Sequence, residues 1–491
     1  MRSRAAAAGL MLLAAGCSTV TEKTVRDAVS PAAAQPWTPP AKAAMPPAPV
    51  EKAAPASAIP EEYLKPGTTL SLAQLVDVGL HANPATREAW SFARAAAANV
   101  GAKRSLYFPT FEADMSLERQ KTPAGNGPGL FSILQTTYGP SIAATWLLFD
   151  FGGREADVQE ATRALYAADW THNAAIQDVV LRIAQAYYGY LNSKALAIAR
   201  QASLDEAKRS LDAAEERHRA GVATIADVLQ AKTSVSQAEL ELQDTQGQVQ
   251  IIRGALATAV GVPANLPVDV GDLPEELPLD MVKKNVDELI ARAVAERPDL
   301  AASRFTALAA QSKIRSVQAE GLPKLSALAS GNRTFYSTPG ADPFSTNYSG
   351  LLLLRVPIFT GFDVEYRTQK AKEEAEAAKA TAEVVEDQVI LDVWSSYYAM
   401  KTATQRVQTT RDLLASARQS AEVADGRYKA GVGSILDLLT TQASLAAARA
   451  EEVQARSLWF LAVAQLAHAT GALVPKAAEI TGVTATKQEI P

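Results

Sequence analysis

Polar and apolar side chains alternate one by one over a short stretch of the chain. In the segment 109–118, four apolar residues alternate with four polar ones. The apolar residues are Phe111, Ala113, Met115 and Leu117, and the polar ones are Glu112, Asp114, Ser116 and Glu118. This period of two predicts a β-strand with one apolar face and one wet, acidic face. A weaker alternation over 141–149 predicts the second strand of a hairpin at about 108–150, with a loop over 120–137.

A helical period replaces the alternation after this hairpin. The segment 154–220 contains one glycine and no proline, and apolar residues such as Ile176, Val180 and Ile183 recur at helical spacing. We therefore predict one helix over about 153–219, which would be roughly 100 Å long at 1.5 Å per residue. No single globular domain buries so long a helix, so it is expected to pack along partner helices as in a coiled coil.

The same succession of elements occurs twice. Asn83-Pro84 matches Arg297-Pro298 at an offset of 214 residues, and Tyr187-Tyr188 matches Tyr397-Tyr398 at an offset of 210. A nearly constant offset over several landmarks indicates an internal duplication. The two copies cover about 71–261 and 287–471, and a linker at 262–286 joins them.

The second copy repeats both the hairpin and the long helix. It is predicted to contain a hairpin over about 322–359 with a loop over 332–347, then a helix over about 363–429; each copy closes with a return helix. The residues assigned to the apolar face of this hairpin are Leu325, Ala327, Ala329, Leu352, Leu354, Val356 and Ile358.

Strands of about ten residues can cross a bilayer when they are tilted. If the apolar faces meet lipid, the polar faces must meet water, and the residues predicted to line that interior are Glu112, Asp114, Glu118 and Arg355. An ordinary sheet packed on a soluble core is the alternative. Open sheet edges are not tolerated in hydrocarbon, and four strands cannot close a barrel, so several chains must combine. A barrel of eight strands from two chains would be filled by its own side chains, whereas a barrel of twelve strands from three chains would be wide enough for a pore.

A glycine-containing turn separates each long helix from its return helix. Gly221 and Gly431 stand where a helix C-terminus favours a residue in the left-handed conformation. Asp227 and Asp437 follow these turns, at positions where a carboxylate stabilises the start of the next helix. Ser71-Leu72-Ala73-Gln74 predicts a capping box at the first helix of the first copy.

The N-terminus has the layout of a bacterial export signal. Two arginines precede the apolar stretch 5–13, and Ala14-Ala15-Gly16 leads to Cys17, the single cysteine of the chain. Residues 1–17 resemble a lipoprotein signal that ends at an acylated Cys17; a secretory signal with an incidental cysteine is the alternative. Ser18 then favours the outer membrane by the same resemblance. The Pro/Ala-rich segment 18–70 is predicted to be an extended tether, and 472–491 a C-terminal tail.

Composition excludes several classes of function. The net charge of −5 and the mixed charge runs give no basic face for nucleic acid. The four histidines are scattered without ligand spacing, so no metal site is predicted. No nucleotide-binding or hydrolase fingerprint occurs, so neither a cofactor nor catalysis is expected.

The two turns and the two strand-to-helix connections carry a family resemblance. The first turn has Arg217-x-x-Ala220-Gly221 followed by Asp227-Val228-Leu229, and the second has Arg427-Tyr428-x-Ala430-Gly431 followed by Asp437-Leu438-Leu439. The connections are 148–154 and 357–361. With the duplication, these motifs resemble the TolC-like outer-membrane efflux proteins over roughly 71–471.

The resemblance implies a mixed α and β membrane protein that forms a homotrimer. Its long α-helical barrel would continue a transmembrane β-barrel to which each protomer gives four strands. It would be a passive exit duct for small molecules, held in the outer membrane by lipid and working with a periplasmic adaptor and an inner-membrane pump. A duct for type I protein secretion, and a lipid-tethered periplasmic coiled-coil scaffold without a pore, are the alternatives.

The resemblance also implies which residues surround the periplasmic entrance. Asp227, Tyr428 and Asp437 match the family's entrance positions, where acidic residues ring the tunnel and a latch of Tyr, Arg and Asp holds the inner helices closed. The latch arginine is replaced by Gly433 and a second acidic residue by Thr440, so this chain departs from the family's latch. We expect Asp437→Ala to loosen the closed end.

Overall fold

The computed structural model describes residues 68–124, 131–279, 285–337 and 342–473. Cys17 and the predicted signal 1–17, nearly all of the tether 18–70 and most of the tail 472–491 therefore lie outside the described residues. Within the described ranges, none of the helices combines the length and apolar character that a membrane crossing requires.

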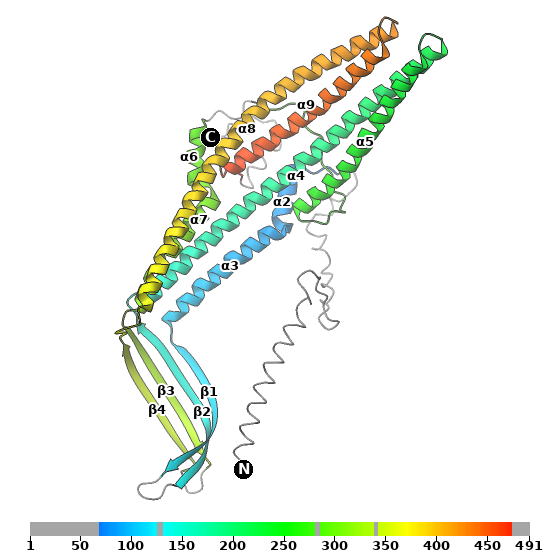
Figure 1. Ribbon diagram of the computed structural model, residues 1–491. Helices are drawn as coiled ribbons and strands as arrows, with labels where there is room; N and C mark the ends of the chain where they lie inside the picture. The colour runs from blue at the N-terminus through cyan, green and yellow to red at the C-terminus, as the bar shows by residue number, and fades with distance from the viewer. Residues whose placement is uncertain (1–67, 125–130, 280–284, 338–341, 474–491) are drawn as a thin grey trace, which may run out of the picture. The chain divides into compact units, whose positions relative to one another are not determined.

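The chain forms two successive sets of elements in the same order (Figure 1). The first set is α2 (Leu72–Ala82), α3 (Pro84–Arg104), the 3-10 helix η3 (Ser105–Tyr107), β1 (Thr110–Ala124), β2 (Phe131–Phe149), α4 (Gly153–Arg219) and α5 (Ile225–Val260). The second set is α6 (Val286–Glu296), α7 (Pro298–Glu320), β3 (Lys324–Tyr336), β4 (Phe344–Arg355), α8 (Asp363–Lys429) and α9 (Ile435–Ala469). The two long helices have 67 residues each and occupy the predicted ranges.

Local sequence explains where the first helices begin. Ser71 and Gln74 form the predicted capping box at α2, and Pro84 occupies the first turn of α3 behind the Asn83 cap. Gly261, in the left-handed conformation at the end of α5, packs against Asn83 so closely that a Cβ would lie 2.7 Å from the Asn83 Cα. Gly471 makes the same approach to Arg297 in the second copy, so the duplication extends to the packing.

The core lies between the long helices of the two copies. α4 packs against α5 and α3 of its own copy and against α7 and α9 of the other, and α9 runs beside α4 in Figure 1. Ile183 and Leu256 are fully buried, and Tyr188 stacks on Phe460 with their ring centroids 4.9 Å apart. Each such apolar side chain contributes about 1.5–3 kcal/mol by leaving water, so this contact between copies holds α4 to α9.

The four strands form one antiparallel sheet in the order β1-β2-β3-β4. The predicted strand length of about ten residues and the predicted loops 120–137 and 332–347 are wrong, because the strands have 15, 19, 13 and 12 residues. The turn-forming residues in these segments are satisfied inside the sheet. Within 332–347, for example, the Tyr336 and Ser345 hydroxyls pair with each other across β3 and β4. Arg333 of the same segment packs against Gly139 of β2, whose position is so close to the Arg333 carbonyl that no other residue fits there.

The apolar face predicted for the second hairpin is too long at its end. β4 stops at Arg355, so Val356 and Ile358 lie in the connection to α8 instead of the strand. Pro357 between them has no N–H to donate to a strand ladder, which explains the stop. Ile358 is 95% exposed.

Two aromatic residues with positive φ precede the long helices. Phe151 (φ 52°) stands beside Gly152 before α4, and Phe362 (φ 67°) stands beside Gly361 before α8. A left-handed non-glycine residue is strained and needs support from its surroundings. Both copies therefore turn from strand to helix through a pair of left-handed residues.

Arg154 joins β2 to α4 at the first of these turns. Its guanidinium donates to the carbonyls of Leu147 and Leu148 (2.6 and 2.9 Å) and to that of Leu106 (3.3 Å). It also lies 3.4 Å from the Asp150 carboxylate, and both side chains are 9% exposed. Asp150 in turn accepts from the Arg154 backbone N–H at 2.7 Å.

The linker between the copies packs across the helices. Val268 and Val270 are buried, and Asp269 accepts hydrogen bonds from Lys194 (3.0 Å) and Tyr190 (3.2 Å) of α4. Partial burial alone would raise the pKa of Asp269, but the bonds from Lys194 and the Val270 backbone outweigh it, and the pKa lies below its ordinary 3.8.

Asp269 is therefore expected to make the stability of the protein depend on pH. A carboxyl whose pKa is lowered by folding stabilises the fold above its ordinary pKa, and this stability is lost as pH falls through the lowered value. We expect wild type to resist denaturant better than Asp269→Asn near pH 7 and the difference to shrink below about pH 4. Denaturation midpoints of both proteins across this range test it; a difference that stays constant with pH would contradict the role of the carboxylate.

Candidate functional site: helix turns and sheet faces

The turns between the long helices and their return helices have the same geometry. Gly221 (φ +76°) and Gly431 (φ +80°) adopt the left-handed conformation. In the first turn, Gly221 donates its N–H to the His218 carbonyl and Val222 to that of Arg217; the second turn repeats both bonds. This Schellman pattern satisfies the last carbonyls of each long helix.

The two return helices begin differently. Thr224 and Asp227 form a reciprocal capping box, in which the Asp227 carboxylate accepts from the Thr224 N–H at 2.8 Å. At α9, the Ser434 hydroxyl accepts from the Asp437 N–H at 3.0 Å, but no return bond from the carboxylate completes a box. The Asp227 carboxylate therefore caps its helix, while that of Asp437 is available for other contacts.

Tyr428 lies between the two turns of one protomer. Its ring is 4% exposed and is covered by the Arg217 guanidinium, whose carbon lies 4.8 Å from the ring centroid. Arg217 also donates to the Tyr428 carbonyl at 2.8 Å. Burial raises the pKa of the Tyr428 phenol; Asp227 adds to the rise and Arg217 opposes it. Among the described residues the phenol oxygen has no hydrogen-bond partner.

A small apolar cluster joins the α4–α5 turn to the α8–α9 turn, and polar contacts continue it along the helices. Tyr428, Ile435 and Leu438 of the second copy share this cluster with Ala214 and Ala231 of the first. Further along the helices, two polar contacts between the copies continue it: Ser210 with Gln442 at 2.9–3.1 Å, and Glu206 with both outer nitrogens of Arg449 at 2.8–2.9 Å. We call this set of contacts the inner joint.

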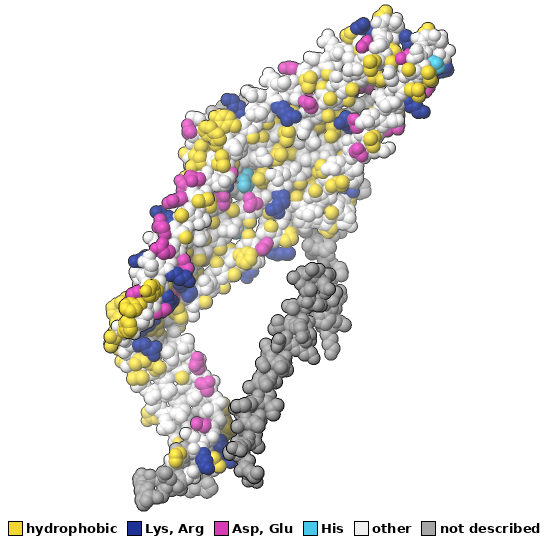
Figure 2. All heavy atoms as spheres, viewed as in Figure 1, with side chains coloured by type: hydrophobic (Ala, Val, Ile, Leu, Met, Phe, Trp, Pro, Cys, Tyr) yellow, Lys and Arg dark blue, Asp and Glu magenta, His cyan; other side chains and the backbone are white. Residues whose placement is uncertain are grey.

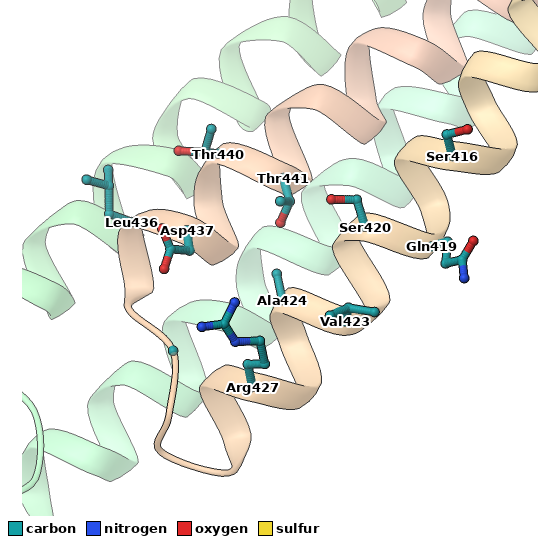
Figure 3. A pocket seen from close by; sticks show the side chains of 11 residues that line it. Ser416, Gln419, Ser420, Val423, Ala424, Arg427, Leu436, Asp437, Thr440 and Thr441 are labelled. Carbon is teal, nitrogen blue, oxygen red and sulfur yellow. The ribbon is translucent and has the colours of Figure 1, made fainter.

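The predicted entrance residues are thus only partly brought together. Asp227 and Tyr428 lie at the inner joint, whereas Asp437 lines a separate groove between α8 and α9 (Figure 3). This groove has a volume of about 680 Å³ and is lined at one end by Asp437 and Arg427, with hydroxyl side chains along it. Gly433 keeps room for Arg427, because a Cβ there would lie 3.1 Å from the Arg427 Cβ.

The strand residues predicted to line a water-filled interior lie on one face of the sheet. Glu112 stands opposite Ala143, and Asp114 opposite Ser141, in a register that continues through β3 to β4. By this register and the alternation along each strand, Glu118 and Arg355 lie on the same face. The opposite face carries the large exposed apolar residues Phe111, Met115, Leu117, Ile142, Leu352 and Leu354.

Aromatic side chains gather near both ends of the apolar face. At one end Tyr138 stacks on Phe335 at 5.3 Å, and Phe344 follows at 6.1 Å. At the other end the pairs Phe149–Phe151 and Phe359–Phe362 lie at 4.7 and 5.3 Å. Figure 2 shows hydrophobic side chains gathered where β4 leads into α8. The sheet therefore presents an apolar band bordered by aromatic rings.

Sequence reasoning missed the roles of two arginines. Arg217 belongs to the turn motif and Arg154 to the strand-to-helix connection, but neither was assigned a contact. The partner of Arg217 is Tyr428, 211 positions away, and only the duplication hints that these turns meet. Arg154 could have been suspected from Asp150 one helical turn earlier.

No group of three or more His, Cys, Asp or Glu side chains within the described ranges is arranged to hold a metal ion. His468 pairs with Asp178 at 2.8 Å as an isolated contact between α9 and α4.

Comparison with known proteins identifies related sequences over most of the chain. The family model described as OEP, outer membrane efflux protein, matches residues 75–262 and 289–472, the two copies of the duplication. Protein CyaE of Bordetella pertussis is 27% identical over 406 residues, covering 80% of this chain and 84% of CyaE. The outer membrane efflux protein BepC of Brucella suis is 25% identical over 378 residues, covering 76% and 79% of the two chains.

A solved structure shares the fold. The outer membrane protein VceC of Vibrio cholerae superimposes with a TM-score of 0.71, covering 82% of this chain and 96% of VceC at 22% identity. At this identity the likeness shows the fold alone.

Proposed function

The chain belongs to the outer membrane efflux protein family, and on this premise we propose that it is the outer-membrane exit duct of a tripartite efflux system. Three copies would form one duct. Twelve strands would close a barrel through the outer membrane, and the long helices would continue it as a tunnel across the periplasm. Small molecules would leave through it passively after delivery by an inner-membrane pump and a periplasmic adaptor.

The observation that carries this proposal is a sheet with two uncovered faces and two unpaired edges. Met115 and Leu117 are 73% and 77% exposed on one face, and Glu112 and Asp114 are exposed on the other. β1 and β4 are the edges of the described sheet. Lipid can cover an apolar face only when no backbone group is left unpaired at an edge, so the strands of further copies must complete the wall.

The size of the apolar band supports a membrane crossing. From Tyr138 to Phe149 β2 advances eleven residues, or about 36 Å at 3.3 Å per residue. A strand tilted by about 40° would then rise roughly 28 Å, close to the apolar band of about 25 Å in outer-membrane barrels. Aromatic rings at both borders match the girdles of such barrels.

The N-terminus would add a second membrane attachment. Acylation of Cys17 would hold each chain at the outer membrane, although one acyl group alone gives only marginal attachment. The sheet would therefore supply the stable insertion, with the lipid positioning the chain.

The first test is whether the purified protein assembles and conducts. We expect a trimer in mild detergent that separates into protomers on heating, and ion conductance when this trimer is added to a planar lipid bilayer. Strictly monomeric protein without conductance would contradict the duct and favour a tethered scaffold. Oligomer mass by light scattering and single-channel recording supply the two measurements.

Asp437→Ala tests the periplasmic entrance. Since no capping bond holds the Asp437 carboxylate, we expect its loss to reduce cation selectivity and to raise conductance. Asp227→Ala is the matched control, because that carboxylate caps α5; its loss is expected to reduce stability more than selectivity. Unchanged conductance and selectivity in Asp437→Ala would reject the entrance role of this residue.

A further inference from the structure

Three basic residues stand on the apolar face of the sheet, the face proposed to meet lipid. The alternation along each strand places Arg119 and Lys121 of β1 on the same side as Leu117, and Arg333 of β3 on the same side as Phe335. All three basic side chains are exposed. A lipid-facing cation is costly at the middle of a membrane and costs little only near its borders, so these positions need an explanation. We call the three residues the basic cluster.

No carboxylate accompanies the basic cluster on this face. The acidic residues of the four strands all lie on the polar face, and they are Glu112, Asp114 and Glu118. The segment 119–137 contains no acidic residue, and 331–347 contains only Asp342. The ion pairs of the described residues include neither Asp342 nor any member of the cluster. The charge of the cluster is therefore not neutralised within the described chain.

The cluster lies at the end of the sheet that points away from the helices. Four residues that pair with one another form a row across the strands: Leu117, Tyr138, Phe335 and Phe344. Arg119 and Lys121 follow this row along β1, and Figure 2 shows Lys and Arg side chains at this end of the sheet. Since the proposed duct has its helices in the periplasm, this end reaches the outer leaflet of the outer membrane.

Arg333 is held so that it reaches the same row. Its guanidinium carbon lies 4.5 Å from the centroid of the Phe344 ring, and its Nε donates to the Thr346 hydroxyl at 3.3 Å. Phe344 pairs with Phe335, two residues beyond Arg333, so the guanidinium extends outward from its own backbone position. Long cationic side chains extend in this way near a membrane border. Its two outer nitrogens have no hydrogen-bond acceptor among the described residues, and their planar fork suits a phosphate group.

The other border of the apolar face carries no such cations. Aromatic pairs mark that border as well, but the basic strand residues near it, Lys324 and Arg355, pair with each other in the register and lie on the polar face. Cations that served only to reach water from the edge of the hydrocarbon would suit either border. The one-sided placement indicates an anionic group that is found in one leaflet only.

We propose that Arg119, Lys121 and Arg333 bind the phosphate groups of a phosphorylated glycolipid in the outer leaflet of the outer membrane. The acyl chains of this lipid would lie along the apolar face beside Met115 and Leu117, and its head group would meet the basic cluster. Arg119 and Arg333 stand two strands apart, roughly 10 Å at 4.7–4.9 Å per strand, so a head group with two separated phosphates can contact both. The inference rests on the proposed insertion of the sheet and names the lipid class at its outer border.

Lipid retention by the wild-type protein tests the proposal without any substitution. Purified protein in mild detergent is mixed with diphosphoryl lipid A, and bound lipid is measured by native mass spectrometry. We expect lipid A with both phosphates to be retained more strongly than the same lipid without phosphates, and more strongly than phosphatidylglycerol, which is anionic but has no sugar. Equal retention of the three lipids overturns the site. Displacement of lipid A by an equal concentration of inorganic phosphate overturns the glycolipid assignment.

Substitution of the basic cluster tests the residues themselves. The variant with Arg119→Gln, Lys121→Gln and Arg333→Gln is expected to bind diphosphoryl lipid A roughly a hundredfold more weakly, at about fivefold for each charge removed. Lys324→Gln is the matched control, because it removes the same charge from the polar face of β3, and its binding is expected to equal that of wild type. Binding by the triple variant that equals that of the control overturns the proposal.

The outcomes separate this inference from the proposed function. If wild type is trimeric and conducts, yet its retention of lipid A depends neither on the phosphates nor on the basic cluster, the lipid site is overturned and the duct stands. If wild type is monomeric without conductance, both are overturned. Should only the triple variant fail to assemble, the comparison of lipids on wild type decides, and Arg333→Gln alone, expected to weaken binding about fivefold, provides the residue test.

Discussion

Replacing Ile142 by arginine is expected to prevent stable insertion of the sheet. Ile142 lies near the middle of the apolar face, between Ala113 of β1 and Gly331 of β3, and is 56% exposed. Arginine at the centre of a lipid-facing strand costs about 2–4 kcal/mol. Since each subunit of a trimer carries the change, we expect little heat-dissociable trimer in outer-membrane fractions and a lower denaturation midpoint.

The neighbouring residue provides the matched control. Ala143 belongs to the same strand but faces the polar side, opposite Glu112. Arginine there can approach a carboxylate in water, so Ala143→Arg is expected to assemble normally and to reduce cation selectivity in single-channel recordings. Equal assembly of the two variants would show that the two faces do not meet different solvents, and the membrane assignment would fail.

Replacing Arg154 by methionine is expected to cause the second large effect. Methionine keeps much of the side-chain length but leaves the buried Asp150 carboxylate without its ion pair and three carbonyls without their donor. Removing one partner of a buried ion pair costs about 3–5 kcal/mol. We expect a lower denaturation midpoint for Arg154→Met, measured by loss of trimer in increasing denaturant.

The second copy offers a control at the corresponding junction. Arg367 pairs with Glu320 but is 45% exposed, so water can replace the pair. Arg367→Met is therefore expected to leave the midpoint nearly unchanged. If the denaturation midpoint of Arg154→Met is no lower than that of Arg367→Met, Arg154 does not hold β2 to α4 in the way its contacts indicate.

Local patterns predicted the elements that depend on local physics. The period of two over Phe111–Glu118 placed β1 and separated its two faces, because side chains of a strand alternate across the sheet whatever it packs against. The proline-free run before Gly221 and the capping residue Ser71 marked helix ends for the same reason. The duplication predicted that each element would occur twice.

The sequence was less informative where turn-forming residues occur in segments that pair as strands. The segments 120–137 and 332–347 look like loops because of their Gly, Pro, Ser and Asn residues, yet most of each is paired in the sheet. Strand pairing is set by the neighbouring strand, and Tyr336 finds its partner, Ser345, only there. Conversely, the apolar alternation through Ile358 continued past the true end of β4 because Pro357 cannot join a ladder.

The sequence by itself determined the order of the elements, the two faces of each strand and the positions of the turns, since these follow from spacing along the chain. Only the tertiary structure decided which side chains meet across the copies. Arg217 reaches Tyr428, and Arg427 instead lines an open groove, although the two arginines stand in equivalent motifs. The physical reason is that one chain contains two copies of the same surface but can bring only one pair of them together.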